Sequence, residues 1–237
     1  VKIKKGQANP SYLKSPLTGI NGDITFSREG LDWKNLTFNY RNDLLNSNAR
    51  IISYKEPQII LILSSKLYSL NADLKTTGNN IKINSFKGFL KNTSFNITGD
   101  IDTSDKDNPL FRLNLDITAD PKDLEAELPD KFADLINKLR LEGLFNITGD
   151  LIAHPGNLRS WGLNLNVASA QLHFLDYRLE DLAMDIEQAD KLLKVKNLTA
   201  TAYNGKITLN MLSNLAVSDP PFNMQINAAN IDLAKLK

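Results

Sequence analysis

Residue types that carry most enzyme chemistry are few in this chain, and they lie far from one another. The only two histidines are His154, beside a Pro-Gly turn, and His173, within a run of alternating residues. Neither has the spacing of a metal site or a catalytic triad, so we assign both a structural role. The chain has no cysteine, which excludes disulfides, thiolate metal sites and a cysteine nucleophile.

The acidic residues give no stronger indication of catalysis. Asp100 with Asp102, and Asp105 with Asp107, lie in segments rich in Asp, Lys and Asn, which are typical of solvated loops. The sequence also lacks a Gly-rich phosphate loop, a nucleophile elbow and a zinc-binding helix motif. We therefore predict that the protein is not an enzyme, with no catalytic residues, no bound metal and no cofactor.

Charge and composition narrow the class of protein further. The chain has 28 basic and 27 acidic residues, mixed along its length, and 42% of its residues are hydrophobic. This composition predicts a folded protein, and it lacks the clustered basic residues that nucleic acid requires. The longest apolar run, Ile59–Leu63, has the length of a buried strand and is far shorter than the ~18 residues of a membrane-spanning helix.

Strict alternation of apolar and polar residues is the dominant pattern. Between positions 111 and 118 every odd residue is apolar and every even residue is polar, and the runs 163–168 and 222–227 are similar. Such alternation places the apolar side chains of a strand on one face of a sheet. We expect the three runs to share one apolar surface, made of Phe111, Leu113, Leu115, Ile117, Leu163, Leu165, Val167, Phe222, Met224 and Ile226.

Turn signals separate the alternating runs. Asn204-Gly205, between Leu198–Ala200 and Ile207–Leu209, predicts a tight hairpin, since this dipeptide suits the positive φ angles of a type I′ turn. Many short strands joined in this way form an antiparallel meander. The sequence thus predicts an all-β, mainly antiparallel fold.

One helix is expected among these strands, over residues 130–140. Phe132, Leu135, Ile136 and Leu139 follow Pro129 at helical spacing, and Gly143 is a candidate stop. Residues 121–128 could form a further short helical turn. We expect the apolar side of the 130–140 helix to cap one end of the sheet.

The sequence also repeats itself. Phe95–Ile101 reads FNITGDI and returns as FNITGDL at Phe145–Leu151, about fifty positions later. Repeats of this size are typical of architectures in which each unit packs only on its neighbours. We expect residues 1–237 to form one continuous β-repeat region with finer units at roughly 1–74, 75–128 and 129–237. Because both ends fall within repeat material, we expect an internal segment of a longer protein.

Leu141–Asp150 follows the expected helix and contains two spaced glycines, and this run resembles the repeat beginning of the AsmA/TamB-like family of bacterial envelope proteins. Phe174–Leu182 and Leu198–Ile207 are similar to its strand and hairpin motifs, although Asn204 replaces a glycine. Ile226–Leu236 resembles the recurring repeat ending. The resemblance covers most of the chain and is clearest from about Asn84 onward.

This resemblance implies an elongated, curved, taco-like antiparallel sheet with an apolar groove. In the family such a groove carries phospholipid acyl chains between membranes and supports outer-membrane homeostasis. The ten alternating residues would line the groove. The protein would be located in the bacterial periplasm, anchored to the inner membrane by parts of its parent outside this chain, with other envelope proteins as possible partners.

Two other functions fit the same patterns. A structural or adhesive β-repeat protein of the cell surface would close its sheets against each other as sandwiches. It would also show Pro/Ser/Thr-rich hinges between units of ~100 residues, which the sequence lacks. A TamB-like assembly factor for outer-membrane proteins would share the groove but bind unfolded strands at its edges. The sequence does not separate this last function from lipid transport.

Overall fold

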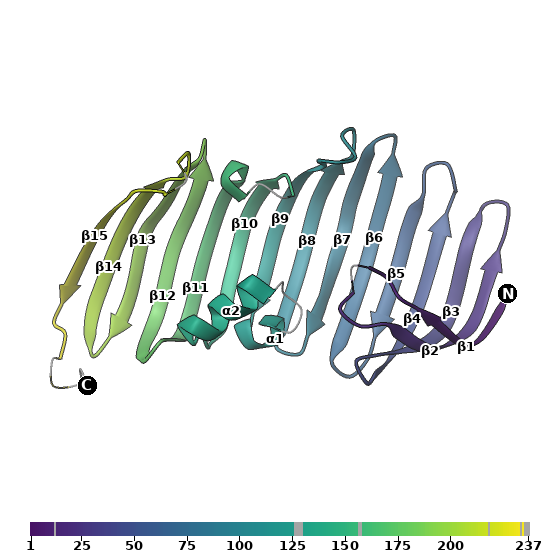
Figure 1. Ribbon diagram of the computed structural model, residues 1–237, viewed down its shortest axis with the longest axis horizontal. Helices are drawn as coiled ribbons and strands as arrows, with labels where there is room; N and C mark the ends of the chain where they lie inside the picture. The colour runs from purple at the N-terminus through teal and green to yellow at the C-terminus, as the bar shows by residue number, and fades with distance from the viewer. Residues whose placement is uncertain (12, 126–129, 156–157, 218, 233, 235–237) are drawn as a thin grey trace. The chain divides into compact units, whose positions relative to one another are not determined.

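Antiparallel β-strands dominate the computed structural model, which describes residues 1–237 except 12, 126–129, 156–157, 218, 233 and 235–237. The described residues form fifteen strands, two short α-helices and one turn of 3-10 helix (Figure 1). The predicted all-β, mainly antiparallel fold is confirmed. The chain divides into two compact units, Val1–Ser104 and Asp105–Lys237. Their boundary falls inside the middle segment, 75–128, that the repeats suggested.

Unit 1, Val1–Ser104, is a meander in which each strand pairs antiparallel with the next one along the chain. Its strands are β1 (Lys2–Ala8), β2 (Leu17–Phe26), β3 (Gly30–Tyr40), β4 (Asp43–Ile52), β5 (Gln58–Ser64), β6 (Tyr68–Thr77), β7 (Asn80–Leu90) and β8 (Thr93–Asp102).

Unit 2, Asp105–Lys237, is a second meander with the same neighbour-to-neighbour pairing. Its strands are β9 (Leu110–Ala119), β10 (Phe145–Ala153), β11 (Gly162–Phe174), β12 (Tyr177–Ala189), β13 (Leu192–Ala202), β14 (Gly205–Asn214) and β15 (Phe222–Ala229). Helices α1 (Pro121–Glu125) and α2 (Asp130–Leu139) lie between β9 and β10, and the 3-10 turn Leu158–Ser160 precedes β11.

Tight two-residue hairpins recur in both units. The predicted hairpin at Asn204-Gly205 is present, but its two positive φ angles belong to Tyr203 (48°) and Asn204 (64°). Gly205 is instead the first residue of β14 and pairs with Ala202. A Cβ on Gly205 would lie only 2.6 Å from the carbonyl oxygen of Ala229. The glycine is therefore required for the close approach of the end of β15, not for the turn itself.

The two copies of the FNITGD repeat become equivalent strands, β8 in unit 1 and β10 in unit 2. Their glycines, Gly99 and Gly149, adopt nearly the same φ angles, 139° and 137°. A Cβ on Gly149 would lie 2.0 Å from the carbonyl oxygen of Asn164 on the next strand. The glycine of the repeat thus permits a backbone conformation and a strand contact that no other residue tolerates.

Helix α2 confirms the helix that the apolar spacing predicted, but Gly143 does not end it. The amide of Leu141 donates to the carbonyl of Ile136 (3.1 Å), and that of Arg140 donates to the carbonyl of Asn137 (3.1 Å). These bonds form a Schellman motif with Arg140 in the left-handed conformation, at φ 47°. Gly143 has a different role, because a Cβ there would lie 2.3 Å from the carbonyl oxygen of Gln171.

Candidate functional site

One face of unit 2 gathers apolar side chains from all seven strands, and we call it the apolar face. Residues directly opposite each other in adjacent strands point to the same side of a sheet, so the strand register assigns each side chain to a face. All ten alternating residues selected from the sequence lie on this side, in β9 (Phe111, Leu113, Leu115, Ile117), β11 (Leu163, Leu165, Val167) and β15 (Phe222, Met224, Ile226).

A central row without any polar side chain runs across the apolar face. In strand order it contains Leu115, Gly149, Leu165, Ile186, Val195, Met211 and Met224, each directly opposite the next. Six gaps of ~4.8 Å between strands give the row a length of about 29 Å. Phospholipid acyl chains are about 15 Å long, half of a ~30 Å hydrocarbon core. The row is therefore long enough for a whole acyl chain.

Most large side chains on the apolar face are only partly buried. Leu115, Leu165 and Met211 are half-buried, and Phe222 remains 67% exposed. A close-packed interior would bury such residues almost completely. The apolar face of unit 2 thus has the character of an accessible surface.

Among the described residues of unit 2, a cluster of buried hydrophobic side chains lies at one end of this face. Leu172, Leu182 and Ala200 are buried there, at 5%, 5% and 3% exposure, and Leu141 packs against them after α2. The amide of Leu175, in the β11–β12 turn, donates to the carbonyl of Leu139 at the end of α2 (2.7 Å). The structure therefore places the end of the helix at one end of the sheet, where it leaves the central row uncovered.

The ten residues selected from the sequence leave out the apolar-face side chains of β10 and of β12 to β14, and in β12 and β13 bulges interrupt the alternation. In β12 Leu179 and Leu182 are three positions apart on the same side, because Asp181 has a φ of 50° and shifts the register with β13. In β13 Asn197 (φ 52°) separates Val195 from Leu198 in the same way. Each bulge reverses the faces of the residues that follow it. In β10 the alternation is intact, so Ile147 and Leu151 were recognisable from the sequence.

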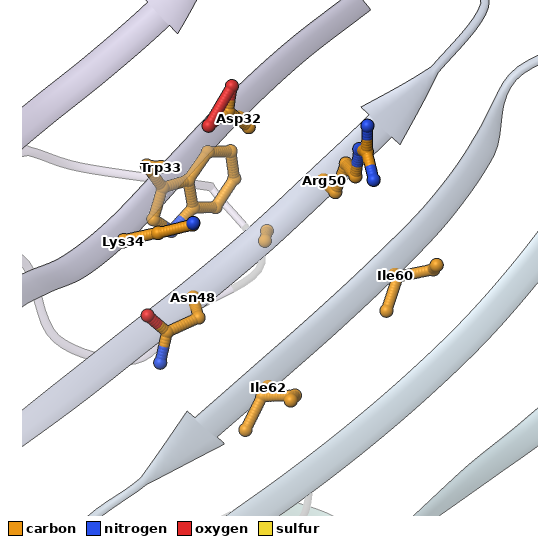
Figure 2. Close-up of a pocket in the computed structure, with 8 residues that line it drawn as sticks. Asp32, Trp33, Lys34, Asn48, Arg50, Ile60 and Ile62 are labelled. Atoms are coloured by element: carbon orange, nitrogen blue, oxygen red, sulfur yellow. The ribbon is translucent and has the colours of Figure 1, made fainter.

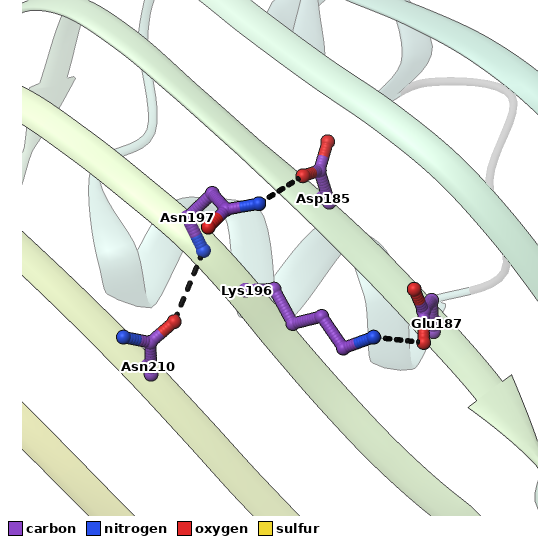
Figure 3. A network of polar contacts seen from close by, with 5 residues as sticks. All are labelled: Asp185, Glu187, Lys196, Asn197 and Asn210. Atoms are coloured by element: carbon purple, nitrogen blue, oxygen red, sulfur yellow. Dashed lines mark hydrogen bonds and ion pairs between the residues drawn. The ribbon is translucent and has the colours of Figure 1, made fainter.

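The opposite side of unit 2, which we call the polar face, is held by cross-strand hydrogen bonds and ion pairs (Figure 3). The side-chain amides of Asn197 and Asn166 donate to the carboxylate of Asp185, at 2.8 and 2.6 Å. These donors, Asn197 foremost, lower the pKa of Asp185 below its ordinary value. The ammonium of Lys196 lies 2.5 Å from the carboxylate of Glu187. Side chains that form hydrogen bonds or ion pairs with each other thus occupy this side of the sheet.

A second ion pair ties α1 to the segment before β10. The ammonium of Lys122 lies 2.7 Å from the carboxylate of Glu142, and their hydrogen bond raises the pKa of Lys122 and lowers that of Glu142. Glu142 also exchanges two backbone hydrogen bonds with His173, at 3.1 and 2.8 Å. These backbone hydrogen bonds to Glu142 therefore fix the position of His173. The other histidine, His154, contacts the carbonyl oxygen of Asn108 through Nδ1 at 3.2 Å.

Unit 1 has an apolar face of its own and also a small apolar area on its polar side. Ile59, Leu61 and Leu63 of β5 share the apolar face, whereas Ile60 and Ile62 point to the other side, opposite Arg50 and Asn48. The apolar run Ile59–Leu63, which has the length of a buried strand, lies within β5 as a strand, but its Ile62 side chain is 45% exposed. A surface pocket of about 330 Å³ lies here (Figure 2), lined by Asp32, Trp33, Lys34, Asn48, Ala49, Arg50, Ile60 and Ile62.

Comparisons with known proteins were made for the whole chain. No family model matches it, and no curated protein or solved structure does.

The described part of the chain contains no group of three or more His, Asp or Glu side chains arranged to hold a metal ion. Among the helices that the structure describes, none has the length and apolar character needed to cross a membrane. The apolar face of unit 2 is a partly exposed apolar surface, and surfaces of this kind commonly mark interaction sites.

Proposed function

We propose that the apolar face of unit 2 binds the acyl chains of phospholipids, and that the protein is an AsmA/TamB-like segment that carries lipid in a bacterial envelope. The single observation that carries this proposal is the accessible central row. Seven residues without a polar side chain stand in register across seven strands, and Leu115, Leu165 and Met211 are all only half-buried.

The chemistry of the central row favours a long, flexible hydrocarbon. Burial of each CH₂ group contributes about 0.8 kcal/mol and needs no directional partner. Because the row lacks hydrogen-bonding side chains, it offers nothing to orient a polar ligand. Leu, Ile, Val and Met provide similar contacts along its length, so an acyl chain can shift along the row without losing a specific bond. Such binding suits lipid transport.

The structural or adhesive function receives less support from the same observations. A sandwich needs a second layer over each apolar face, so that large side chains become nearly fully buried. Unit 2 is a single meander, and its large apolar side chains reach full burial mainly near Leu172 and Leu182. The accessible row therefore favours a mobile lipid ligand over a permanent protein layer.

Two matched double variants test this proposal. Leu115→Asp with Leu165→Asp places charges in the central row, and Ile152→Asp with Leu212→Asp places the same charges on the polar face. Ile152 and Leu212 are already 50% and 44% exposed, and Arg112 and Lys194 lie directly opposite them. Each purified variant is incubated with phosphatidylethanolamine and phosphatidylglycerol vesicles that contain a phospholipid with a photoactivatable acyl chain.

We expect the wild-type protein and the polar-face variant to crosslink to the lipid. The yield of crosslinked protein should be at least tenfold lower for the central-row variant than for the wild type. All three should keep the same circular dichroism spectrum, since half-buried positions tolerate a charge better than a close-packed core. A wild-type protein that takes up no lipid would contradict the proposal. So would equal losses in the two variants, or unfolding of the central-row variant alone.

A further inference from the structure

Two isoleucines lie on the polar side of unit 1, where the residues opposite them are polar. Ile60 lies opposite Arg50 on β4 and Asp73 on β6, and Ile62 lies opposite Asn48 on β4. Ile62 is 45% exposed, so burial within the chain does not account for it. Apolar side chains that remain exposed next to each other on a polar surface commonly mark a binding site.

Both isoleucines line the pocket of about 330 Å³ on β3, β4 and β5 (Figure 2). Small-molecule sites typically have volumes of about 300–1,000 Å³. A second hollow shares Asp32 and Arg50 with this pocket and is lined by Ile52, which is 40% exposed. The apolar lining therefore continues beyond one side chain, and it provides a surface for a short hydrocarbon chain.

Two cations border the apolar lining. Arg50 and Lys34 both line the pocket and are exposed. In the part of the chain that the structure describes, neither of them forms an ion pair. The one lining carboxylate, that of Asp32, is opposite Arg50 and two residues before Lys34. Two positive charges and one negative charge leave a net charge of +1, which one bound monoanion neutralises.

Two further carboxylates flank the pocket without lining it. Asp73 accepts a hydrogen bond from the side-chain amide of Gln58 (2.9 Å), which already engages one of its oxygens. Asp23 lies opposite Lys34 on β2, on the side of that lysine away from the isoleucines. The cation directly beside the apolar lining is therefore Arg50, since it is opposite Ile60 in the strand register.

We propose that this pocket binds a small amphipathic monocarboxylate, with the chemistry of a free medium-chain fatty acid. Arg50 binds the carboxylate and Lys34 assists it, while the hydrocarbon chain lies over Ile60 and Ile62. A guanidinium offers two parallel N–H donors that match the two oxygens of a carboxylate. The hydrocarbon chain needs no directional partner, because removal of its apolar surface from water stabilises it. This site lies in unit 1, so it does not depend on lipid binding by the apolar face of unit 2.

Photolabelling with octanoate that carries a diazirine on its hydrocarbon chain locates the bound molecule. The full chain is irradiated with this probe, and labelled residues are identified by peptide mass spectrometry. Labels in β4 and β5 are thereby counted separately from labels in unit 2. We expect labels at or next to Ile60 and Ile62. Unlabelled octanoate should halve this labelling at a concentration at least tenfold lower than octylammonium does, because only the carboxylate complements Arg50.

Two matched variants test the role of Arg50. Arg50→Gln and Lys87→Gln each remove one exposed positive charge from the polar side of unit 1, but Lys87 is on β7 and outside the pocket. We expect labelling of β4 and β5 to fall at least fivefold in Arg50→Gln and to stay unchanged in Lys87→Gln.

Three results would overturn the proposal: no label in β4 or β5 of the wild-type protein, equal labelling of the two variants, or displacement by octylammonium as effective as that by octanoate. Circular dichroism checks that both variants are folded. Should Arg50→Gln unfold, the competition between octanoate and octylammonium for the wild-type protein decides alone.

Discussion

Leu115 and Leu165 lie on either side of Gly149 in the central row, each directly opposite the glycine in the strand register. Gly149 leaves a notch between them, and its φ of 137° is one that residues with a side chain rarely adopt. The glycine of the repeated FNITGD motif thus shapes the surface that we propose to hold lipid, and it also permits the close contact between β10 and β11.

Replacing this glycine should therefore destabilise the fold. In Gly149→Ala the new Cβ meets the carbonyl oxygen of Asn164 at 2.0 Å, which the backbone must move to avoid. We expect the free energy of unfolding to fall by about 2 kcal/mol or more. Gly162→Ala is the matched control, because its Cβ would have only ordinary contacts, the nearest at 3.5 Å. Urea denaturation of both variants measures the difference, and equal losses would show that the contact at Gly149 relaxes without cost.

Alanine substitutions distinguish the closed end of the apolar face from the accessible row. Leu172 is 5% exposed and packs within the buried cluster, so Leu172→Ala should cost about 3 kcal/mol of stability. Leu165 is only half-buried, so Leu165→Ala should cost about 1 kcal/mol. Urea denaturation in the absence of lipid measures both losses. A loss at Leu165 as large as that at Leu172 would indicate a close-packed layer over the row.

The polar face should make stability depend on pH through Asp185. Hydrogen bonds from Asn197 and Asn166 lower the pKa of Asp185 in the folded protein below the ordinary 3.8 of an aspartate. This stabilisation is fully present above pH 3.8 and disappears as the pH falls through the lower, folded-state pKa. Asp185→Asn should therefore flatten the loss of stability in acid, with Asn166→Ala between it and wild type. An unchanged acid profile in Asp185→Asn would contradict this assignment.

The sequence predicted the strands well where the alternation is unbroken, as in β9, the first half of β11, and β15. It missed much of the apolar face in β12 and β13, because Asp181 and Asn197 adopt positive φ angles. The identity of a single residue does not predict such an angle. The end of α2 was predicted to within a residue, but the left-handed residue that ends it was taken to be Gly143 and not Arg140, since arginine rarely adopts that conformation. Long-range contacts, such as that of Gly143 with Gln171, determine which glycines serve turns and which serve strand packing.

Two adjacent residues of β10 allow the most direct test of the central claim. Ile147 lies on the apolar face and Thr148 on the polar face, as their partners Val167 and Asn166 show. In a background with Trp33 and Trp161 replaced by Phe, a single tryptophan is introduced at either position, and its fluorescence is measured with phospholipids brominated on the acyl chain. We predict strong quenching for Ile147→Trp and little for Thr148→Trp. Equal quenching at both positions, or none at Ile147→Trp, would contradict the proposal that the apolar face binds acyl chains.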